Sequence, residues 1–82
     1  MIEKMQMQPY ETSDYQVAVA LCSLGFKLAY VDKSHGQRAV FEFDHDPDIS
    51  KCVEAFFRDE LQLNPRVVLT NARLVKDRLY AA

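Results

Sequence analysis

FKLAYV (residues 26–31) and RAVFEF (38–43) alternate inward and outward side chains, and these two runs decide the fold of this 82-residue chain. Between them lies the polar turn KSHGQ (33–37), which contains one of the two glycines. Strand-like alternation on both sides of a glycine-containing turn predicts an antiparallel β-hairpin. A hairpin is marginally stable in water on its own, so we expect the rest of the chain to cover it.

The alternation assigns the hairpin side chains to two faces, because neighbouring residues of a strand point in opposite directions. The apolar face carries Phe26, Leu28, Tyr30, Ala39, Phe41 and Phe43. The opposite face carries Lys27, Ala29, Val31, Arg38, Val40 and Glu42. We expect the first face to pack against helices and the second to be partly solvated, with strand edges that need protection.

A first helix is predicted from about residue 13 to residue 24. Ser13 and Gln16 have the spacing of a capping box, and Gly25 supplies a left-handed residue that ends the helix. This helix is apolar nearly all round, which is typical of a helix buried on more than one side. Either another helix or a second subunit then covers its second face. The residues expected to serve self-association there are Tyr15, Val19 and Cys22.

Two further helices follow the hairpin, and each begins with a polar cap followed by proline. For the second helix we expect Asp46 as the N-cap and Pro47 at the first position. Its apolar stripe consists of Ile49, Cys52, Val53, Phe56, Phe57 and Leu61. For the third helix, Asn64 and Pro65 repeat the signal. Its apolar stripe consists of Val68, Ala72, Val75 and Leu79, widened by Val67 and Leu74.

These elements predict one small α+β domain over residues 1–82, in the order α-β-β-α-α, with the antiparallel hairpin packed against helices. The segment 1–9 is expected to be either flexible or an N-terminal edge strand. MQMQ (5–8) alternates as a strand does, and Pro9 lacks a backbone donor. Proline therefore restricts such a strand to the edge of the sheet, or ends it.

Composition narrows the function classes. The net charge of −2 lacks the strongly basic balance of many nucleic-acid-binding proteins, and no apolar run is long enough to cross a membrane. We therefore expect a cytoplasmic protein without membrane association. Cys22 and Cys52 are expected to be reduced, buried thiols, although a disulfide is not excluded. No recognisable catalytic motif occurs, so we expect neither an enzyme nor a cofactor.

The densest polar cluster is DHDPD (44–48), whose aspartates match the first three ligand positions of a calcium loop. The match then fails, because Ile49 stands where the loop needs glycine and Ala55 where it needs a bidentate glutamate. We interpret the cluster as acidic residues at the positive end of a helix dipole, and expect no metal.

Charge is polarised along the chain. Residues 44–60 carry six acidic and two basic side chains, whereas residues 61–82 carry four basic side chains and one acidic one. The basic residues are Arg66, Arg73, Lys76 and Arg78. Lys33 and Arg38 of the hairpin extend the basic patch if they lie on the same side. Such a patch is typical of a contact surface for nucleic acid or an acidic partner, or else of an ordinary solvated helix face.

Several short strings resemble a family of small bacterial and phage proteins of unknown function, over roughly residues 10–80. The strings are YETSD (10–14), AVAL (18–21), LGF (24–26), AVFEF (39–43), NPR (64–66) and LVKDRLY (74–80). The resemblance implies a phage or mobile-element setting and carries no known activity, so no catalytic residue is transferred.

Two functional hypotheses follow from these observations. The first is a small non-enzymatic module that binds a protein partner or associates with itself as a homodimer, since the first helix and the hairpin edges need covering. The alternative is a nucleic-acid-binding accessory protein that uses the basic C-terminal helix.

Overall fold

The hairpin forms where the alternation predicts it, between β2 (Leu28–His35) and β3 (Arg38–Phe43) in a computed structural model that describes residues 8–81. The two strands pair antiparallel, and Gly36 occupies the turn between them with a φ of 73°. A third strand, β1 (Tyr10–Thr12), pairs antiparallel with β3, which gives the order β1-β3-β2. β3 is therefore the central strand.

Within the described residues, an N-terminal edge strand begins directly after Pro9. The expected strand at residues 5–8 falls mainly on residues 1–7, which lie outside the described part of the chain. The observed strand β1 begins at Tyr10, the residue directly after the proline. Proline cannot donate a ladder hydrogen bond, so the start of pairing just beyond it is physically consistent.

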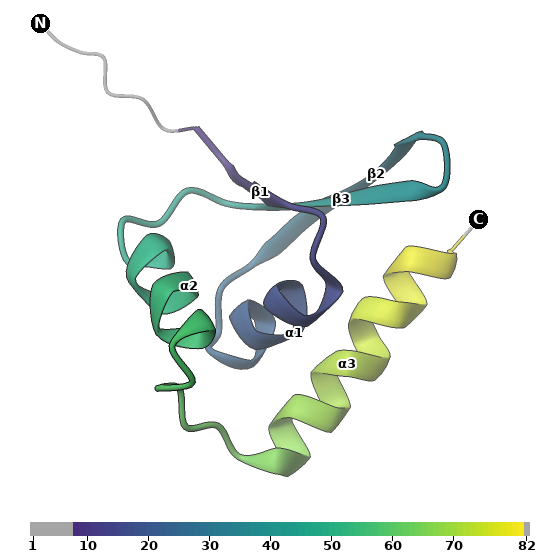
Figure 1. Ribbon diagram of the computed structural model, residues 1–82. Helices are drawn as coiled ribbons and strands as arrows, with labels where there is room; N and C mark the ends of the chain where they lie inside the picture. Colours follow the sequence, from purple (N-terminus) through teal and green to yellow (C-terminus); the bar gives the residue numbers. More distant parts are fainter. Residues whose placement is uncertain (1–7, 82) are drawn as a thin grey trace, which may run out of the picture.

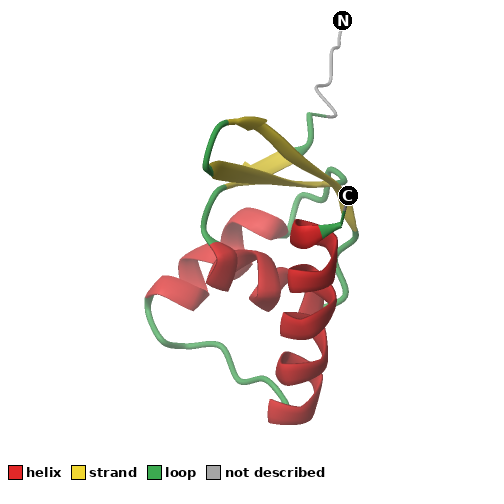
Figure 2. Cartoon of the chain, turned by 90° about the vertical axis from the view of Figure 1, so that its right-hand side faces the viewer, coloured by secondary structure: helices red, strands yellow, loops and turns green. Residues whose placement is uncertain are grey.

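Three helices cover one side of the sheet: α1 (Tyr15–Ser23), α2 (Ile49–Phe57) and α3 (Pro65–Tyr80) (Figure 2). The helix α1 lies between α2 and α3, which pack against it rather than broadly against each other (Figure 1). The domain is therefore α+β, as predicted, with β1 as an additional strand. The buried core consists of Val17, Ala18, Val19, Leu21, Leu28, Val31, Phe41, Phe43, Ile49 and Val75.

One expected inward residue of the hairpin points outward. Tyr30 is 56% exposed, whereas Val31 is only 9% exposed and belongs to the core. The cause is a register shift: Leu28 pairs with Phe43, but Tyr30 pairs with Glu42, so one residue of β2 is extra. An extra residue reverses the alternation beyond it. The prediction that Tyr30 faces the core and Val31 faces solvent is therefore wrong.

The cap of α1 lies one residue later than predicted. The Asp14 carboxylate accepts hydrogen bonds from the backbone N–H groups of Gln16 at 2.9 Å and Val17 at 3.2 Å. Ser13 instead accepts a hydrogen bond from Arg38, which removes it from the capping position. Gly25, with a φ of 98°, follows the helix end as predicted. A left-handed residue there lets the next amides reach back to the last free carbonyls.

The helix α2 begins two residues later than predicted, with Asp48 as its N-cap. The Asp46 carboxylate accepts a hydrogen bond from the Asp48 N–H at 2.8 Å, so Asp46 and Pro47 form a turn before the helix. At the other end, Phe57 is 64% exposed rather than part of the core stripe. By contrast, Asn64 caps α3 as predicted, accepting a hydrogen bond from the Arg66 N–H at 2.8 Å.

Candidate interaction surface on helix α3

The helix α3 has one face in the core and one face in solvent. Asn64 and Pro65 fix its start, and the fifteen residues that follow Pro65 in the helix contain no glycine or proline. Val75 is buried, and the partly buried residues of the same stripe pack against the core, as predicted: Val68, Ala72 and Leu79. Since the inner stripe holds the helix in place, the residues opposite to it are free to contact other molecules.

We call the solvent-facing row of α3 the outer stripe. It consists of Arg66, Leu69, Arg73, Lys76 and Tyr80, which are spaced at i, i+3, i+7, i+10 and i+14. All five are exposed, and the two apolar members are exceptional for their size, with Leu69 at 70% and Tyr80 at 75%. The stripe therefore combines three cations with two large apolar side chains on one helix face.

The outer stripe is the basic part of an acidic protein. The helix α3 carries four basic residues and one acidic residue, so it contributes +3 to a chain of net charge −2, and the remainder carries −5. The ion pairs within residues 8–81 join His35 to Asp32 and Arg58 to Glu54, and neither of them involves the stripe. Its cations therefore face solvent without an acidic partner from the described part of the chain.

Three of the six predicted contact cations are used within the fold. The Lys33 ammonium donates to the carbonyls of Leu79 and Ala81, where a positive charge suits the C-terminus of α3. The Arg78 guanidinium donates to the Leu28 carbonyl at 3.1 Å. Arg38 donates from Nε to the Ser13 hydroxyl at 3.1 Å.

The structure nevertheless brings two of these cations next to the outer stripe. Lys33 and Arg38 line a shallow groove of about 280 Å³ together with Leu79 and Tyr80, at the C-terminal end of α3. Arg78 lines a different groove, beside Cys22 and Leu28. The hairpin therefore extends the basic surface, while Arg78 lies away from it.

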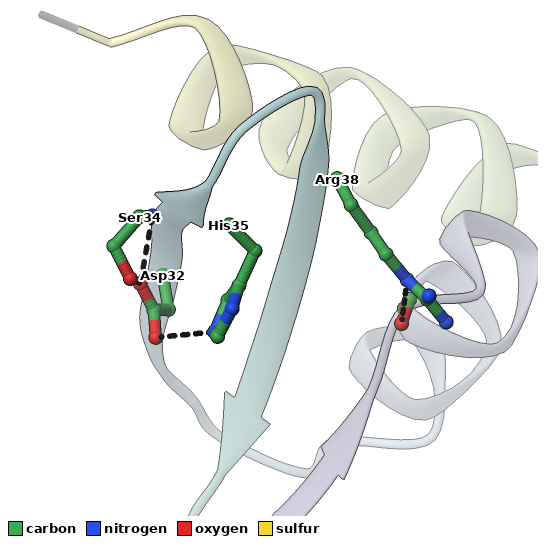
Figure 3. Close-up of polar contacts among 5 residues, drawn as sticks. Asp32, Ser34, His35 and Arg38 are labelled. Atoms are coloured by element: carbon green, nitrogen blue, oxygen red, sulfur yellow. Dashed lines mark hydrogen bonds and ion pairs between the residues drawn. The ribbon is translucent and has the colours of Figure 1, made fainter.

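The polar cluster at the hairpin tip is explained by local turn geometry (Figure 3). The Asp32 carboxylate accepts hydrogen bonds from the Ser34 hydroxyl at 2.6 Å and the Ser34 N–H at 2.9 Å, and it lies 3.3 Å from His35 Nε2. These contacts, the Ser34 hydroxyl first, lower the pKa of the Asp32 carboxyl. The groove beside this tip, about 540 Å³, is lined partly by His35 and Arg38, whose side chains already have partners there.

Helix α1, where we expected self-association, is largely covered by other elements in the described part of the chain. Val19 is only 6% exposed, because α2, α3 and the sheet surround α1. The Tyr15 hydroxyl donates to the Ala72 carbonyl at 2.9 Å, which ties α1 to α3. Cys22 is half-buried, and burial raises the pKa of its thiol, with Arg78 opposing the shift. Most of the second face of α1 is therefore covered within one chain, apart from the groove between α2 and α3 that Tyr15, Val19 and Ala20 line.

Sequence reasoning missed the exposure of Leu69, Tyr80 and Phe57. The prediction that Val67 and Leu74 widen the apolar stripe of α3 is also wrong, because these side chains are 40% and 54% exposed. The exposure of Leu69 could be inferred from the sequence, because Leu69 directly follows Val68 of the inner stripe and therefore points to another side of the helix. The exposure of Phe57 depends on where α2 ends, which its periodicity does not show.

The remaining candidate cluster, at residues 44–48, serves local structure. His45 Nδ1 lies 3.3 Å from the Gln8 carbonyl, and Asp46 closes the turn before α2. Residues 8–81 contain no group of three histidine, cysteine or acidic side chains placed to hold a metal ion. Across the same residues, every helix is too short or too polar to span a bilayer.

The fold and this surface define a small α+β domain whose most distinctive feature is an exposed helix face rather than an enclosed cleft. The chain belongs to the family described as Domain of unknown function (DUF5659), which matches residues 7–81. No curated protein and no solved structure matches the chain significantly.

Proposed function

We propose that this protein is a small non-enzymatic module that binds a protein partner through the outer stripe of α3. One observation carries the proposal: Arg66, Arg73 and Lys76 share a solvent-facing row with Leu69 and Tyr80. Arginine and tyrosine are enriched at protein interfaces, and large exposed apolar side chains beside them supply area that binding removes from water. The partner surface is acidic where it meets the cations.

A second copy of this chain is a poor symmetric partner for the stripe. In a two-fold interface the same patch lies on both sides, so the cations of the stripe would face a patch that holds three cations and no acidic residue. Like charges placed opposite each other are costly in an interface. The stripe is therefore suited to a different protein, and self-association of the chain would need another surface.

Site-specific photo-crosslinking tests the proposal. A photoreactive amino acid at position 69 or 80, introduced in the native host, should give the same discrete protein adduct from both sites. The adduct should be lost when Arg73→Glu is added, because the cation that faces the acidic partner is reversed. Position 51 on the solvated face of α2 is the matched control. Absence of an adduct, or the same adduct from position 51, would contradict the proposal.

Nucleic-acid binding is the second candidate, and the nearby hairpin cations favour it. Lys33 and Arg38 extend the basic surface beyond Tyr80. This candidate predicts binding to a labelled single-stranded or duplex oligonucleotide that weakens steeply with salt. Under this candidate, Arg73→Glu reduces binding strongly and Leu69→Ser leaves it nearly unchanged. A protein interface is sensitive to both changes, because it uses the exposed leucine as well as the cation.

We also propose a cytosolic location, because the two cysteines are free thiols and the cytosol keeps thiols reduced. The resemblance to bacterial and phage proteins supports a phage or mobile-element setting for the module.

A further inference from the structure

An apolar groove runs between α2 and α3, with α1 as its floor. The groove has a volume of about 330 Å³ and is lined by Tyr15, Gln16, Val19, Ala20, Phe56, Leu63, Val68 and Ala72. It exists because α2 and α3 both pack on α1 instead of closing on each other (Figure 1). Residues 58–64 connect the end of α2 to the start of α3.

The groove walls have little to offer a polar ligand. Gln16 carries the one amide side chain of the lining, and the Tyr15 hydroxyl already donates to the Ala72 carbonyl. The other lining residues are apolar. A site of this composition binds apolar side chains and discriminates by shape rather than by hydrogen bonds.

The lip of the groove on the α3 side is cationic. Lys76 follows Ala72 by one helical turn, and Leu69 precedes Ala72 by three residues, so both stand beside the lining row. Both side chains are exposed. The groove is therefore continuous with the outer stripe: an apolar floor meets an exposed leucine and then a row of positive charges.

We infer that this groove binds an amphipathic helix of the partner protein, with apolar residues in the groove and acidic residues against the α3 lip. The inference rests on the proposed function and specifies its partner. The groove, at about 330 Å³, has room for a few apolar side chains, and an amphipathic helix presents such side chains in one row at i, i+3, i+4 and i+7. Charge complementarity selects acidic residues on the flank that faces α3, because Lys76 stands beside the lining row and Arg73 belongs to the same exposed stripe.

The test uses the full chain labelled with ¹⁵N and a synthetic helical peptide. The peptide carries leucines in an i, i+3, i+4, i+7 pattern, with glutamates at the flanking positions. Adding it should shift the amide signals of Val19, Ala20 and Ala72, and much less those of the hairpin. A matched peptide with lysines in place of the glutamates should bind about tenfold more weakly, because it meets like charges at the lip.

Two substitutions at exposed positions test the contribution of the charge at the lip without disturbing the core. Lys76→Glu should weaken the glutamate peptide by about tenfold and strengthen the lysine peptide. Lys51→Glu makes the same charge change on the far face of α2 and should leave both affinities unchanged. Because Lys76 and Lys51 are both exposed, neither change is expected to prevent folding.

Each of the possible results either supports or overturns the inferred helix binding. No binding, equal binding of the two peptides, or shifts that map to the hairpin would overturn the inference. A concentration-dependent dimer whose amide shifts map to Val19 and Ala72 would also overturn it, because the groove would then belong to a second copy. If the photo-crosslinks from positions 69 and 80 form while the peptides fail, the inference falls and the proposed function stands. If neither is observed, both fall.

Discussion

Asp14 is the residue whose side chain fixes the start of α1. It satisfies two backbone N–H groups that have no partner inside the helix. We expect Asp14→Ala to lower the free energy of unfolding by about 1 kcal/mol, the usual loss for an N-cap. Urea denaturation followed by circular dichroism measures the change. Ser13→Ala is the control: it removes one exposed contact with Arg38, so an equal or larger effect there would contradict the assignment.

Asp32 gives the hairpin tip a dependence on pH. Its pKa is lowered by hydrogen bonds from Ser34, and to a smaller degree by His35. Because the folded pKa lies below the unfolded one, the stabilisation is present above the unfolded pKa and is lost as the pH falls through the folded pKa. The relevant window is therefore acidic, below about pH 4.

Titration of the side-chain carboxyl by ¹³C NMR checks this expectation. In Ser34→Ala, the pKa of Asp32 should rise towards its ordinary value, because the largest cause of the shift is removed. A wild-type pKa at or above the ordinary value for aspartate would contradict the expected hydrogen bonding.

At the scale of elements, β2 shows how one extra residue changes what a strand buries. Val31 lies in the core, while Tyr30 faces solvent. We expect Val31→Ala to lower the free energy of unfolding by about 2 kcal/mol through lost burial and a small cavity. Tyr30→Thr should cost less than about 1 kcal/mol, since threonine also favours strands. Chemical denaturation of both variants measures the difference, and the reverse order would mean that β2 is not bulged.

The C-terminus of α2 places a non-glycine residue in the left-handed region. Asp59 has a φ of 60°, and the N–H groups of Asp59 and Glu60 donate back to the carbonyls of Phe56 and Ala55. This is the geometry in which glycine is favoured, and Gly25 occupies the equivalent place after α1. Asp59→Gly should therefore raise the free energy of unfolding by a few tenths to about 1 kcal/mol.

Thermal and urea unfolding of Asp59→Gly measure that gain. Gly25→Ala is the opposite experiment, because alanine is strained at a φ of 98°, and it should destabilise the protein. A loss of stability in Asp59→Gly would show that the aspartate contributes more than the left-handed conformation costs.

The sequence was sufficient to predict which helices and strands form. It was insufficient to predict the exact pairing register of the strands. Periodicity and caps predicted the hairpin, the α+β class and the start of α3 at Asn64. The bulge in β2 was not predictable, because Phe26, Leu28 and Tyr30 alternate without a break. Burial of Val31 is decided by pairing with β3, which is a property of two strands rather than one.

The same dependence on contacts between distant residues explains why the candidate site was predicted only in part. The cations of α3 were visible in the sequence, but not which of them the fold itself would use. Arg78 and Lys33 are engaged by carbonyls distant in sequence, at Leu28 and at the end of α3. Their roles depend on long-range packing, which no local pattern specifies. The groove likewise results from three helices meeting at α1 and has no signature in any one of them.

At the scale of the whole molecule, Lys33 ties the hairpin to the end of α3. Its ammonium donates to two carbonyls that lack helical partners, those of Leu79 and Ala81. We expect Lys33→Met to increase hydrogen exchange in the last turn of α3, with a loss of global stability below about 1 kcal/mol.

Amide exchange followed by NMR distinguishes this local effect from general unfolding. The amides of α1 should keep their protection in Lys33→Met, because α1 is held by the core. Lys27→Met, at an exposed position near the start of the hairpin, is the control and should leave α3 unchanged. Uniform loss of protection in α1 and α3 would show that Lys33 stabilises the entire domain.

Because α1 lies at the centre of the domain, its residues maintain the fold. Residues on the surface, such as those of the outer stripe, are free to vary. The five residues Val17–Leu21 are buried, whereas every residue of the outer stripe is exposed. Substitutions on the stripe therefore change stability little, and substitutions in α1 change it strongly. Related chains can therefore diverge along the outer stripe of α3 while the scaffold stays the same. Under the proposed function, differences between related chains should be concentrated on this helix face, where each difference alters the surface that a partner meets without altering the scaffold.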